Sequence, residues 1–486
     1  MVGFEKIDLI KARERLAGKV KPNIDIHLEQ IYYEKKPYLV IHVPHKNDTL
    51  VTTSSGKVYI RDGRSSRPMS PKEIEAAVRS LQTYDWSAEE LSDLQPMECI
   101  ELDILQDALD AFCQLRTKKN QPFKISTSHF LEAIGATRNG VITKGGLLFL
   151  GKEDIIRKIL GEYEYRFSWK TRSGDLRIND VWSGCIWSAI KRAKSHFQTC
   201  NKILDFDFEN KNYQFPLLDE SAFHEAYLNA LVHRDYSSDG MVSVNFTGDK
   251  LVITSPGTFY GGVTADNIAI HEPRHRNKSL AKTLMLYQLV DRAGMGVLRM
   301  GIRSLMYGRS FPQFRETLDS VEVAMDAEYL RTGIFVITVD NPGRFGIPEL
   351  LILNSVYENE YISVSKILKQ LEKLSSDPWT DILSAINQLK GYVELCGNKT
   401  GVFIRVCRDA INMFKVSKIF RASPASEKYV RLYTYFKKHG KASNEDLTGL
   451  LGYNYSSQTS AFLRRAEYVK RTGHGPNAKW YLCNGA

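Results

Sequence analysis

The sequence predicts an α+β protein of several domains that ends in two tandem winged helix-turn-helix units. At 486 residues the chain exceeds a single domain, since domains hold roughly 100–200 residues. Short β-rich runs and amphipathic helices follow one another without the regular alternation of a parallel α/β fold. Residues 347–486 contain the same helix and strand pattern twice.

Composition narrows the class of protein. Apolar residues make up 43% of the chain and charged residues 25%, which is ordinary for globular proteins with large buried cores. No run of about 18 apolar residues occurs, which excludes a membrane span. The first residues lack the apolar stretch of a secretory signal, so we expect a cytoplasmic protein.

The seven cysteines are scattered, and none forms a C-x-x-C pair or lies near a histidine at zinc-finger spacing. We therefore expect buried cytosolic thiols, with neither zinc nor a disulfide framework.

Positive charge is concentrated at the C-terminal end. The net charge of the chain is +10. Residues 415–486 hold thirteen Lys or Arg against four Asp or Glu, a net charge of +9. A segment with nearly all the excess positive charge is a candidate polyanion-binding element. A merely soluble, Lys-rich surface is the alternative.

The first third of the chain changes from strands to helices. Residues 24–62 contain short β-rich runs bounded by turn residues. Ser70 and Glu73 form a capping box that begins the helix EIEAAVRSL. The polar, acidic residues 84–97 are interpreted as a linker. Residues 98–160 are expected to be mainly helical, up to an apolar strand at 147–151.

A helix through residues 224–234, followed by strands at 242–246 and 250–255, contains the first candidate site residues. Glu225 and Asn229 are spaced i, i+4 and share one helix face. A carboxylate and a carboxamide one turn apart can orient water and complete the oxygen coordination of Mg²⁺. The spacing alone is common by chance.

Two glycine-containing segments follow this helix. Gly257 lies within ITSPGTFYGG (253–262), and Gly294 and Gly296 lie within RAGMGVLR (292–299). Glycines allow backbone amides to approach phosphate oxygens closely, and a helix N-terminus favours negative charge. A pair of ordinary turns is the alternative interpretation.

These motifs resemble a known family. E-A-x-x-N-A-x-x-H-R-D-Y, then I-T-S-P-G, then G-x-G-x-x-R are similar to Schlafen-type (AlbA-like) DNA-binding proteins that carry a GHKL-type ATPase domain, many of them named as helicase-related transcriptional regulators. KVYIRDGRSSRPMSPKEI (57–74) and TKGGLLFLGK (143–152) add to the match. The resemblance extends over about residues 20–345. It implies a partial AlbA-like domain and a GHKL (Bergerat-type) α/β sandwich.

The resemblance assigns roles at an ATP and Mg²⁺ site. Glu225 would activate water as a catalytic base and Asn229 would bind Mg²⁺. The loops around the nucleotide, and a lid over it, would come from the remaining matched positions: Gly257, Gly294, Gly296, Arg274, Arg276 and Asn277.

Two positions depart from the GHKL pattern. Ser255 stands where these ATPases have the aspartate that pairs with the adenine amino group, and Phe259 stands at the second glycine. Loss of that carboxylate removes a charge-assisted hydrogen bond of about 1.5–3 kcal/mol. Nucleotide binding is therefore expected to be weak, altered in base preference or lost, and any ATPase activity weak.

His233, Arg234 and Asp235 also spell the catalytic-loop tripeptide of protein kinases. The other kinase motifs are missing from suitable places. We therefore expect structural polar contacts for these residues at the end of the 224–234 helix.

By the same resemblance, we expect the front of the AlbA-like domain to be shortened. The chain starts at a point that matches the middle of the domain, and the early carboxylates of Schlafen nucleases are absent. A half-domain leaves an unpaired sheet edge, which another protomer or a separate partner chain is expected to cover. The alternative is a remnant that packs on the next domain.

The two C-terminal repeats differ in charge. Residues 347–409 hold seven basic and eight acidic residues, a net charge of −1, which suits packing or dimerisation. Residues 415–486 are the candidate for double-stranded DNA, with a recognition helix at 456–465 and a wing around GHGPN. The candidate DNA-contacting residues are Ser457, Gln458, Arg464, Arg465, Lys470, Arg471 and Lys479. Protein contact is the competing interpretation.

The predicted organisation is a partial AlbA-like domain (1–83), a connecting α/β region (98–215), a GHKL-type domain (216–345), a first winged helix (347–409) and a second, basic one (415–486). The leading hypothesis is a nucleotide-responsive DNA-binding regulator in transcription or antiphage defence. The alternatives are a non-enzymatic scaffold with a relic ATPase fold and a nuclease component completed by a partner chain.

Overall fold

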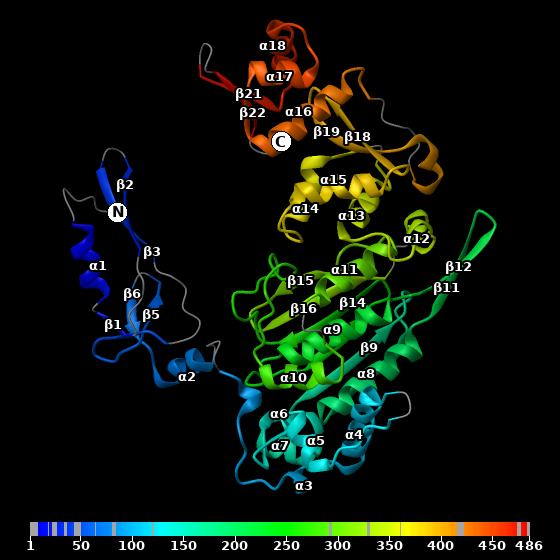
Figure 1. Ribbon diagram of the computed structural model, residues 1–486. Coiled ribbons are helices and arrows are strands. Elements are labelled where there is room, and N and C mark those ends of the chain that lie inside the picture. Colours follow the sequence, from blue (N-terminus) through cyan, green and yellow to red (C-terminus); the bar gives the residue numbers. More distant parts are fainter. Residues whose placement is uncertain are drawn as a thin grey trace.

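The computed structural model has an α+β fold (Figure 1). It describes residues 8–17, 19–21, 27–33, 36–42, 50–63, 65–79, 84–118, 121–290, 294–327, 331–359, 361–415, 422–473 and 478–483. The helices are α1 (Leu9–Ala17), α2 (Pro71–Arg79), η1 (Trp86–Ala88), α3 (Pro96–Cys99), α4 (Leu102–Arg116), α5 (Thr127–Ala133), α6 (Lys144–Leu150), α7 (Glu153–Ile159), α8 (Ile186–Cys200), α9 (Glu220–His233), α10 (Lys278–Leu286), α11 (Gly296–Met306), α12 (Thr332–Val339), α13 (Ile347–Val356), α14 (Val364–Leu371), α15 (Pro378–Gln388), η2 (Arg408–Met413), α16 (Ser426–His439), α17 (Asn444–Leu451) and α18 (Ser456–Arg465).

Strands occur along the whole chain and pair mostly as antiparallel neighbours. They are β1 (Val20–Lys21), β2 (His27–Tyr33), β3 (Lys36–His42), β4 (Thr52–Thr53), β5 (Tyr59–Asp62), β6 (Ser65–Pro68), β7 (Thr137–Arg138), β8 (Val141–Ile142), β9 (Glu164–Lys170), β10 (Leu176–Ser183), β11 (Ile203–Phe208), β12 (Lys211–Pro216), β13 (Val242–Phe246), β14 (Lys250–Pro256), β15 (Gln313–Glu316), β16 (Ser320–Asp326), β17 (Tyr361–Ser363), β18 (Val393–Asn398), β19 (Gly401–Val406), β20 (Lys441–Ser443), β21 (Val469–Thr472) and β22 (Lys479–Leu482).

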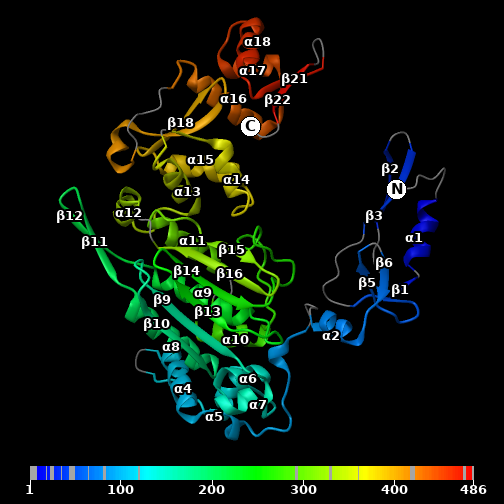
Figure 2. The same ribbon diagram turned by 180° about the vertical axis from the view of Figure 1, so that it is seen from behind.

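The segment from α1 to α2 forms three two-stranded pairings, β1–β4, β2–β3 and β5–β6, and it lies apart from the main body in both views (Figures 1 and 2). Among its residues whose side chains are described, Val58 is the only buried apolar one. Ile31, Tyr32, Ile41 and Tyr59 are exposed. This segment therefore contains little core of its own.

The predicted capping box at the start of α2 is confirmed. The backbone N–H of Ser70 donates to Glu73 Oε2 at 2.8 Å, and the backbone N–H of Glu73 donates to Ser70 Oγ at 3.4 Å. The side chain of Arg67 also donates two hydrogen bonds to Glu73. These contacts satisfy N–H groups that the first helical turn leaves without a partner.

Residues 84–97 are not a linker, which corrects the sequence prediction. Trp86 is 8% exposed and stacks on Tyr236, with ring centroids 5.2 Å apart. Asp85 Oδ2 accepts a hydrogen bond from the backbone N–H of Ser279, and Ser87 Oγ accepts one from that of Leu280. The polar composition of this segment gave no sign that Trp86 is buried against Tyr236. It also gave no sign that Asp85 and Ser87 cap α10.

The main body is built on one six-stranded sheet of order β10–β9–β13–β14–β16–β15. All neighbours are antiparallel except β9 and β13, which are parallel. Strands β9 and β10 precede residue 215 and the other four follow it. The expected division at residue 215 therefore falls inside this sheet, and both sides share one hydrophobic cluster.

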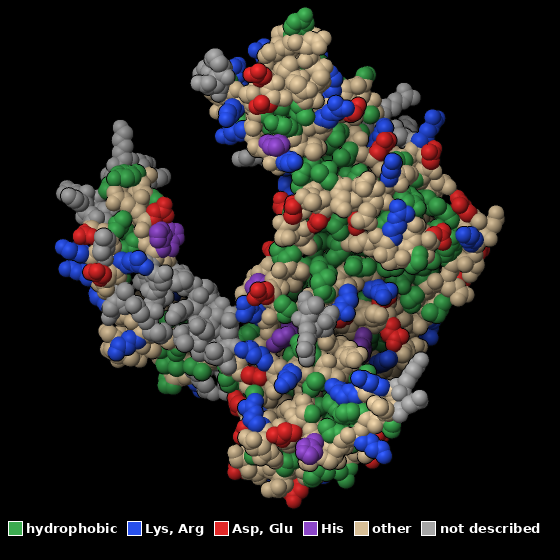
Figure 3. Space-filling model, in the orientation of Figure 1, with side chains coloured by type: hydrophobic (Ala, Val, Ile, Leu, Met, Phe, Trp, Pro, Cys, Tyr) green, Lys and Arg blue, Asp and Glu red, His purple; other side chains and the backbone are tan. Residues whose placement is uncertain are grey.

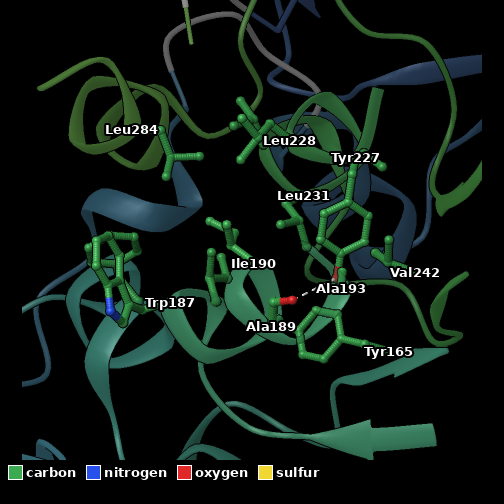
Figure 4. Close-up of a cluster of buried hydrophobic side chains, with 14 of the residues drawn as sticks. Tyr165, Trp187, Ala189, Ile190, Ala193, Tyr227, Leu228, Leu231, Val242 and Leu284 are labelled. Atoms are coloured by element: carbon green, nitrogen blue, oxygen red, sulfur yellow. Dashed lines mark hydrogen bonds between the residues drawn. The ribbon is translucent and has the colours of Figure 1, made fainter. Parts of the chain in front are cut away.

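Helices α8 and α9 pack against each other and against this sheet (Figure 4). Tyr227 of α9 points toward α8, where its hydroxyl donates to the carbonyl oxygen of Ala189 at 3.5 Å. Tyr165 of β9 and Leu231 of α9 are fully buried in the same cluster. The apolar residues of α9 thus face the core, and its polar residues remain for the opposite side.

The apolar run at 147–151 is helical, not the predicted strand. Thr143 Oγ1 accepts the backbone N–H of Gly146 at 2.9 Å and begins α6. Gly145 and Gly146 pack so closely on the backbone of Ser87 and Ala136 that a Cβ atom would lie 2.7 Å and 2.1 Å from it. A short run that is buried on all sides has no periodicity to separate helix from strand.

The last 140 residues form two similar units, each with three helices and a three-stranded antiparallel sheet. The first has the sheet order β17–β19–β18 and the second β20–β22–β21. The predicted helices and strand pairs of both units are present, and the short strands β17 and β20 are additional. Both units share one hydrophobic cluster that extends from Leu305 to Trp480.

Hairpin β11–β12 projects from the body on one side (Figures 1 and 2). Its aromatic residues Phe206, Tyr213 and Phe215 pack against Phe335 of α12. Among the described residues, no helix is both long and apolar enough to traverse a bilayer.

Candidate functional site

A cavity of about 170 Å³ lies between α9, β14, the segment 257–275 and the start of α11. Seven of the residues that the sequence assigned to the nucleotide site line it: Glu225, Asn229, Ser255, Gly257, Arg274, Gly294 and Gly296. The structure thus brings together residues that are up to 71 positions apart in the sequence. Their roles toward a nucleotide stay predictions.

The polar stripe of α9 forms one wall. Asp219 begins the helix by accepting the backbone N–H of Ala222 at 2.9 Å. Glu225, Asn229 and His233 recur every four residues and all line the cavity. Asn229 Nδ2 donates to Glu225 Oε1 at 3.3 Å. The two side chains therefore lie together, with oxygen atoms on the side of α9 that faces away from the core.

The opposite wall contains the glycines. Gly294 has a φ of +67°, and a Cβ there would lie 2.4 Å from Pro273 Cγ. A Cβ on Gly296, the first residue of α11, would lie 1.8 Å from Glu225 Oε1. The carboxylate of Glu225 thus sits directly against a helix N-terminus, where the partial positive charge of the helix favours an anion.

A methyl group at Gly296 should displace the Glu225 carboxylate without unfolding the protein. Glu side chains have several rotamers, and alanine favours a helix over glycine by up to about 1 kcal/mol. We expect Gly296→Ala to unfold within a few degrees of the wild type, and its crystal structure to show Glu225 in another rotamer. An unchanged Glu225 rotamer would contradict the close approach.

Ser255 is tied to the protein. It is 8% exposed, and its hydroxyl donates to the carbonyl oxygen of Ala230 at 2.6 Å. The Ser255 hydroxyl, which the resemblance predicts in place of an adenine-binding carboxylate, therefore bonds to α9, and its remaining capacity is to accept hydrogen bonds. Phe259 also lines the cavity.

The segment assigned to a lid divides into two parts. Arg276 forms an ion pair with Asp235 at 2.9 Å and donates to the carbonyl oxygen of Thr258. Asn277 is fully buried, and its Nδ2 donates to the carbonyl oxygens of Val232 and Arg234 at the end of α9. These two residues anchor the loop to α9.

Arg274 is the one of the three lid residues that lines the cavity. Its guanidinium also pairs with Glu272 at 3.2 Å. Arg274 Nε and His275 Nδ1 are buried polar atoms without a hydrogen-bond partner among the described residues. Such atoms are uncommon in folded proteins, and they are available to a ligand.

Two stacked histidines complete the wall. The rings of His233 and His275 lie 5.3 Å apart between centroids. Burial, with the neighbouring His275 and Arg276, lowers the pKa of His233 to about 3. Burial and Lys278 also lower the pKa of His275. Both rings are therefore neutral at physiological pH and offer one donor and one acceptor nitrogen each.

His233 was missed as a cavity residue by sequence reasoning, although a signal was present. It continues the i, i+4 spacing of Glu225 and Asn229 by one more turn. His275 had no such signal, because only the fold places it against α9.

The expected structural polar contacts are confirmed for Arg234 and Asp235 of the tripeptide, whereas His233 lines the cavity. Arg234 is fully buried, donates to the carbonyl oxygen of Gly240 at 2.6 Å and lies over the Tyr163 ring at 4.6 Å. Asp235 accepts from Arg276 and from the backbone N–H of Ser237. These contacts fix the turn after α9.

Within the described part of the chain, no group of three or more His, Cys, Asp or Glu side chains is arranged to hold a metal ion. Glu225 and Asn229 alone supply too few protein oxygens for a dedicated cage. They match the way Mg²⁺ enters nucleotide sites, where phosphates and water complete its coordination.

The second candidate surface lies on the last repeat, where Lys and Arg side chains gather at the top of Figure 3. All seven predicted DNA-contacting residues are exposed on α18, β21 and β22: Ser457, Gln458, Arg464, Arg465, Lys470, Arg471 and Lys479. Phe462, Leu463, Tyr468 and Trp480 are buried, so they belong to the core. Wing residues 474–477 lie outside the described residues.

Three family models match parts of the chain. The model described as "Schlafen, AlbA_2" matches residues 1–70, and a domain of unknown function matches residues 77–166. The model described as "Putative ATP-dependent DNA helicase recG C-terminal" matches residues 239–325. No curated protein matches the chain.

A solved structure supports the fold. The crystal structure of the DIP2311 protein from Corynebacterium diphtheriae is similar to the present one with a TM-score of 0.53. The match is 18% identical in sequence and covers 85% of this chain and 82% of that chain. At this identity the likeness concerns the fold alone.

Proposed function

We propose that this chain, an AlbA-like protein with an ATPase-like domain, is a nucleotide-responsive DNA-binding regulator. The observation that carries the proposal is the convergence of seven predicted nucleotide-site residues on one cavity. In this proposal the sheet and helices around the cavity are a GHKL-type ATPase fold. The two C-terminal units are winged helices, of which the second binds double-stranded DNA.

The residues of the cavity fit the phosphate end of ATP with Mg²⁺. Asn229 would bind the metal and Glu225 would orient water, while Arg274, with a buried Nε that lacks a partner, would bind a phosphate oxygen. The bound metal would neutralise phosphate charge. Chain residues His233 and His275 stay neutral and add donor and acceptor nitrogens without adding charge.

The cavity is small for a whole nucleotide. About 170 Å³ is below the roughly 300–1,000 Å³ of most small-molecule sites. A whole nucleotide therefore exceeds this volume, and an outward movement of the segment 257–275 would make room for it. Arg276 and Asn277 hold this segment to the end of α9, so its movement would reach the turn that Arg234 stabilises.

Asn229→Ala tests the nucleotide part of this proposal. We expect the affinity for a non-hydrolysable ATP analogue with Mg²⁺ to fall about tenfold or more, because the loss of a contact to a charged group costs about 1.5–3 kcal/mol. Calorimetric titration measures it. Asn212→Ala, on the projecting hairpin, is the matched control. Absence of binding by the wild type, or equal affinity in both variants, would remove ATP from the proposal.

A scaffold with a relic ATPase fold is the second candidate, favoured by the small cavity and by the hydrogen bond that ties Ser255 to α9. The two candidates differ in one outcome. If Glu225→Ala and Asn229→Ala both leave DNA binding and the cellular phenotype intact, the cavity serves no nucleotide and the scaffold explains the fold.

A further inference from the structure

A second, larger cleft lies outside the cavity just described. It has a volume of about 830 Å³ and separates the ATPase-like unit from the first C-terminal unit. One wall comes from the residues that follow α11, the loop that ends in β15 and the segment 265–269. The other comes from α13 and α14. Its volume lies within the range of most small-molecule sites.

Positive charge dominates the lining of this cleft. Among the described residues, five cationic side chains line it, against the acidic side chain of Asp266: Arg309, Arg331, Lys366, Lys369 and Lys373. Lys373 pairs with Asp266 at 2.5 Å, which joins the two walls. The basic residues of segment 347–409 are therefore unevenly distributed, although its net charge is −1. Three of its seven basic residues line this one cleft.

Helix α14 presents its lysines on one face. Lys366 and Lys369 are spaced i, i+3, and both are exposed, while Ile367 and Leu371 are buried on the other face. Among the described residues, neither lysine has a hydrogen-bond or ion-pair partner. Both lysines thus line the cleft without a paired acid in the described part of the chain.

The opposite wall contains a cation that is built into the fold. Arg309 is 3% exposed, and its guanidinium lies over the Tyr307 ring at 4.8 Å. Burial lowers its pKa to about 10, although Tyr307, Asp219 and Asp326 act in the other direction. Arg309 therefore keeps its positive charge at neutral pH, in a place where a charge is costly to bury.

Like charges gathered around one cleft repel each other, and an anion between them relieves that repulsion. Apolar side chains, including Leu305, Phe311 and Leu374, line the same cleft and can pack on a ring. Phosphate suits both kinds of cation, because arginine binds it through its planar fork and lysine as a point charge.

We propose that this cleft is a second ligand site, which binds the phosphate groups of a nucleotide or of a nucleic-acid strand. The inference goes beyond the proposed function, because none of its cationic residues lines the smaller cavity. A ligand here contacts both walls, so it fixes the first C-terminal unit relative to the ATPase-like unit.

The test compares the full-length chain with Lys366→Gln/Lys369→Gln. Calorimetric titration with an ATP analogue and fluorescence anisotropy with a short single-stranded oligonucleotide separate the two sources of phosphate. The affinity for one of these probes is expected to fall about tenfold or more. Lys390→Gln/Arg408→Gln is the control, since it removes the same charge from exposed positions of the same unit outside the cleft.

If Lys366→Gln/Lys369→Gln loses affinity for the ATP analogue, the cleft is a nucleotide site. If it loses affinity for the oligonucleotide, the cleft binds a nucleic-acid strand. Unchanged affinity for both probes, or an equal loss in the control variant, overturns the inference. Asn229→Ala keeps this result distinct from the proposed function. If only Asn229→Ala weakens ATP binding and the oligonucleotide binds the lysine variant normally, the cavity is the nucleotide site and the cleft binds no phosphate.

Discussion

Replacement of Arg464 and Arg465 by alanine is expected to lower the affinity for duplex DNA by about thirtyfold or more. Both side chains are exposed in the last turn of α18, the helix that we propose as the recognition helix of a winged helix. An arginine on a guanine edge is worth about 1–3 kcal/mol, and one on a phosphate lowers the slope of log affinity against log salt by about one.

The salt dependence separates these two roles. Anisotropy titrations at several salt concentrations should show a slope smaller by about two if both arginines bind phosphates, and an unchanged slope with altered sequence preference if they read bases. Arg431→Ala/Lys438→Ala removes the same charge from exposed positions of α16 and serves as the control. Equal losses in both double variants would mean that α18 is no recognition helix.

The local elements of this fold were predictable where a pattern spans the whole element. The helix with Glu225 and Asn229 has a cap and an apolar face, and the strands around GNKTG are bounded by turn residues. Both C-terminal units could be recognised because the same order of elements occurs twice. The α2 capping box is local in sequence, so it needed no tertiary information.

Elements determined by tertiary contacts were not predictable. Helix α6 is buried on all sides, so its sequence carries no periodicity. Residues 84–97 read as polar, yet Trp86 inserts between Tyr236 and Lys144. Strand β9 pairs with β13, which lies beyond the domain boundary expected at residue 215. Sequence patterns gave no sign of this pairing, because parallel pairing joins segments far apart in sequence.

The same division applies to the candidate site. The spacing of Glu225 and Asn229 and the two glycine segments were visible in the sequence, and all of them line one cavity. The volume of that cavity, the hydrogen bond from Ser255 to α9 and the contribution of His275 depend on distances across the fold. Charge counts likewise described each unit correctly but gave no sign that Lys366 and Lys369 line the same cleft as Arg309.

Trp86→Ala is expected to destabilise the sheet-containing unit by about 3–5 kcal/mol, the usual cost of removing a buried large aromatic side chain. The indole is 8% exposed, stacks on Tyr236 at 5.2 Å and meets the edge of Tyr163 at 6.5 Å. Tyr236 follows the turn at the end of α9. The loss therefore loosens the element that carries Glu225 and Asn229.

Urea unfolding followed by near-UV circular dichroism measures this loss, and Trp86→Phe is the matched variant. Phenylalanine keeps the aromatic stack on Tyr236, so it should recover more than half of the lost stability. A change below about 1 kcal/mol in Trp86→Ala would mean that residues 84–97 are a surface linker after all. Asp85 and Ser87 of the same segment cap the first turn of α10, so the packing of this segment also stabilises that helix.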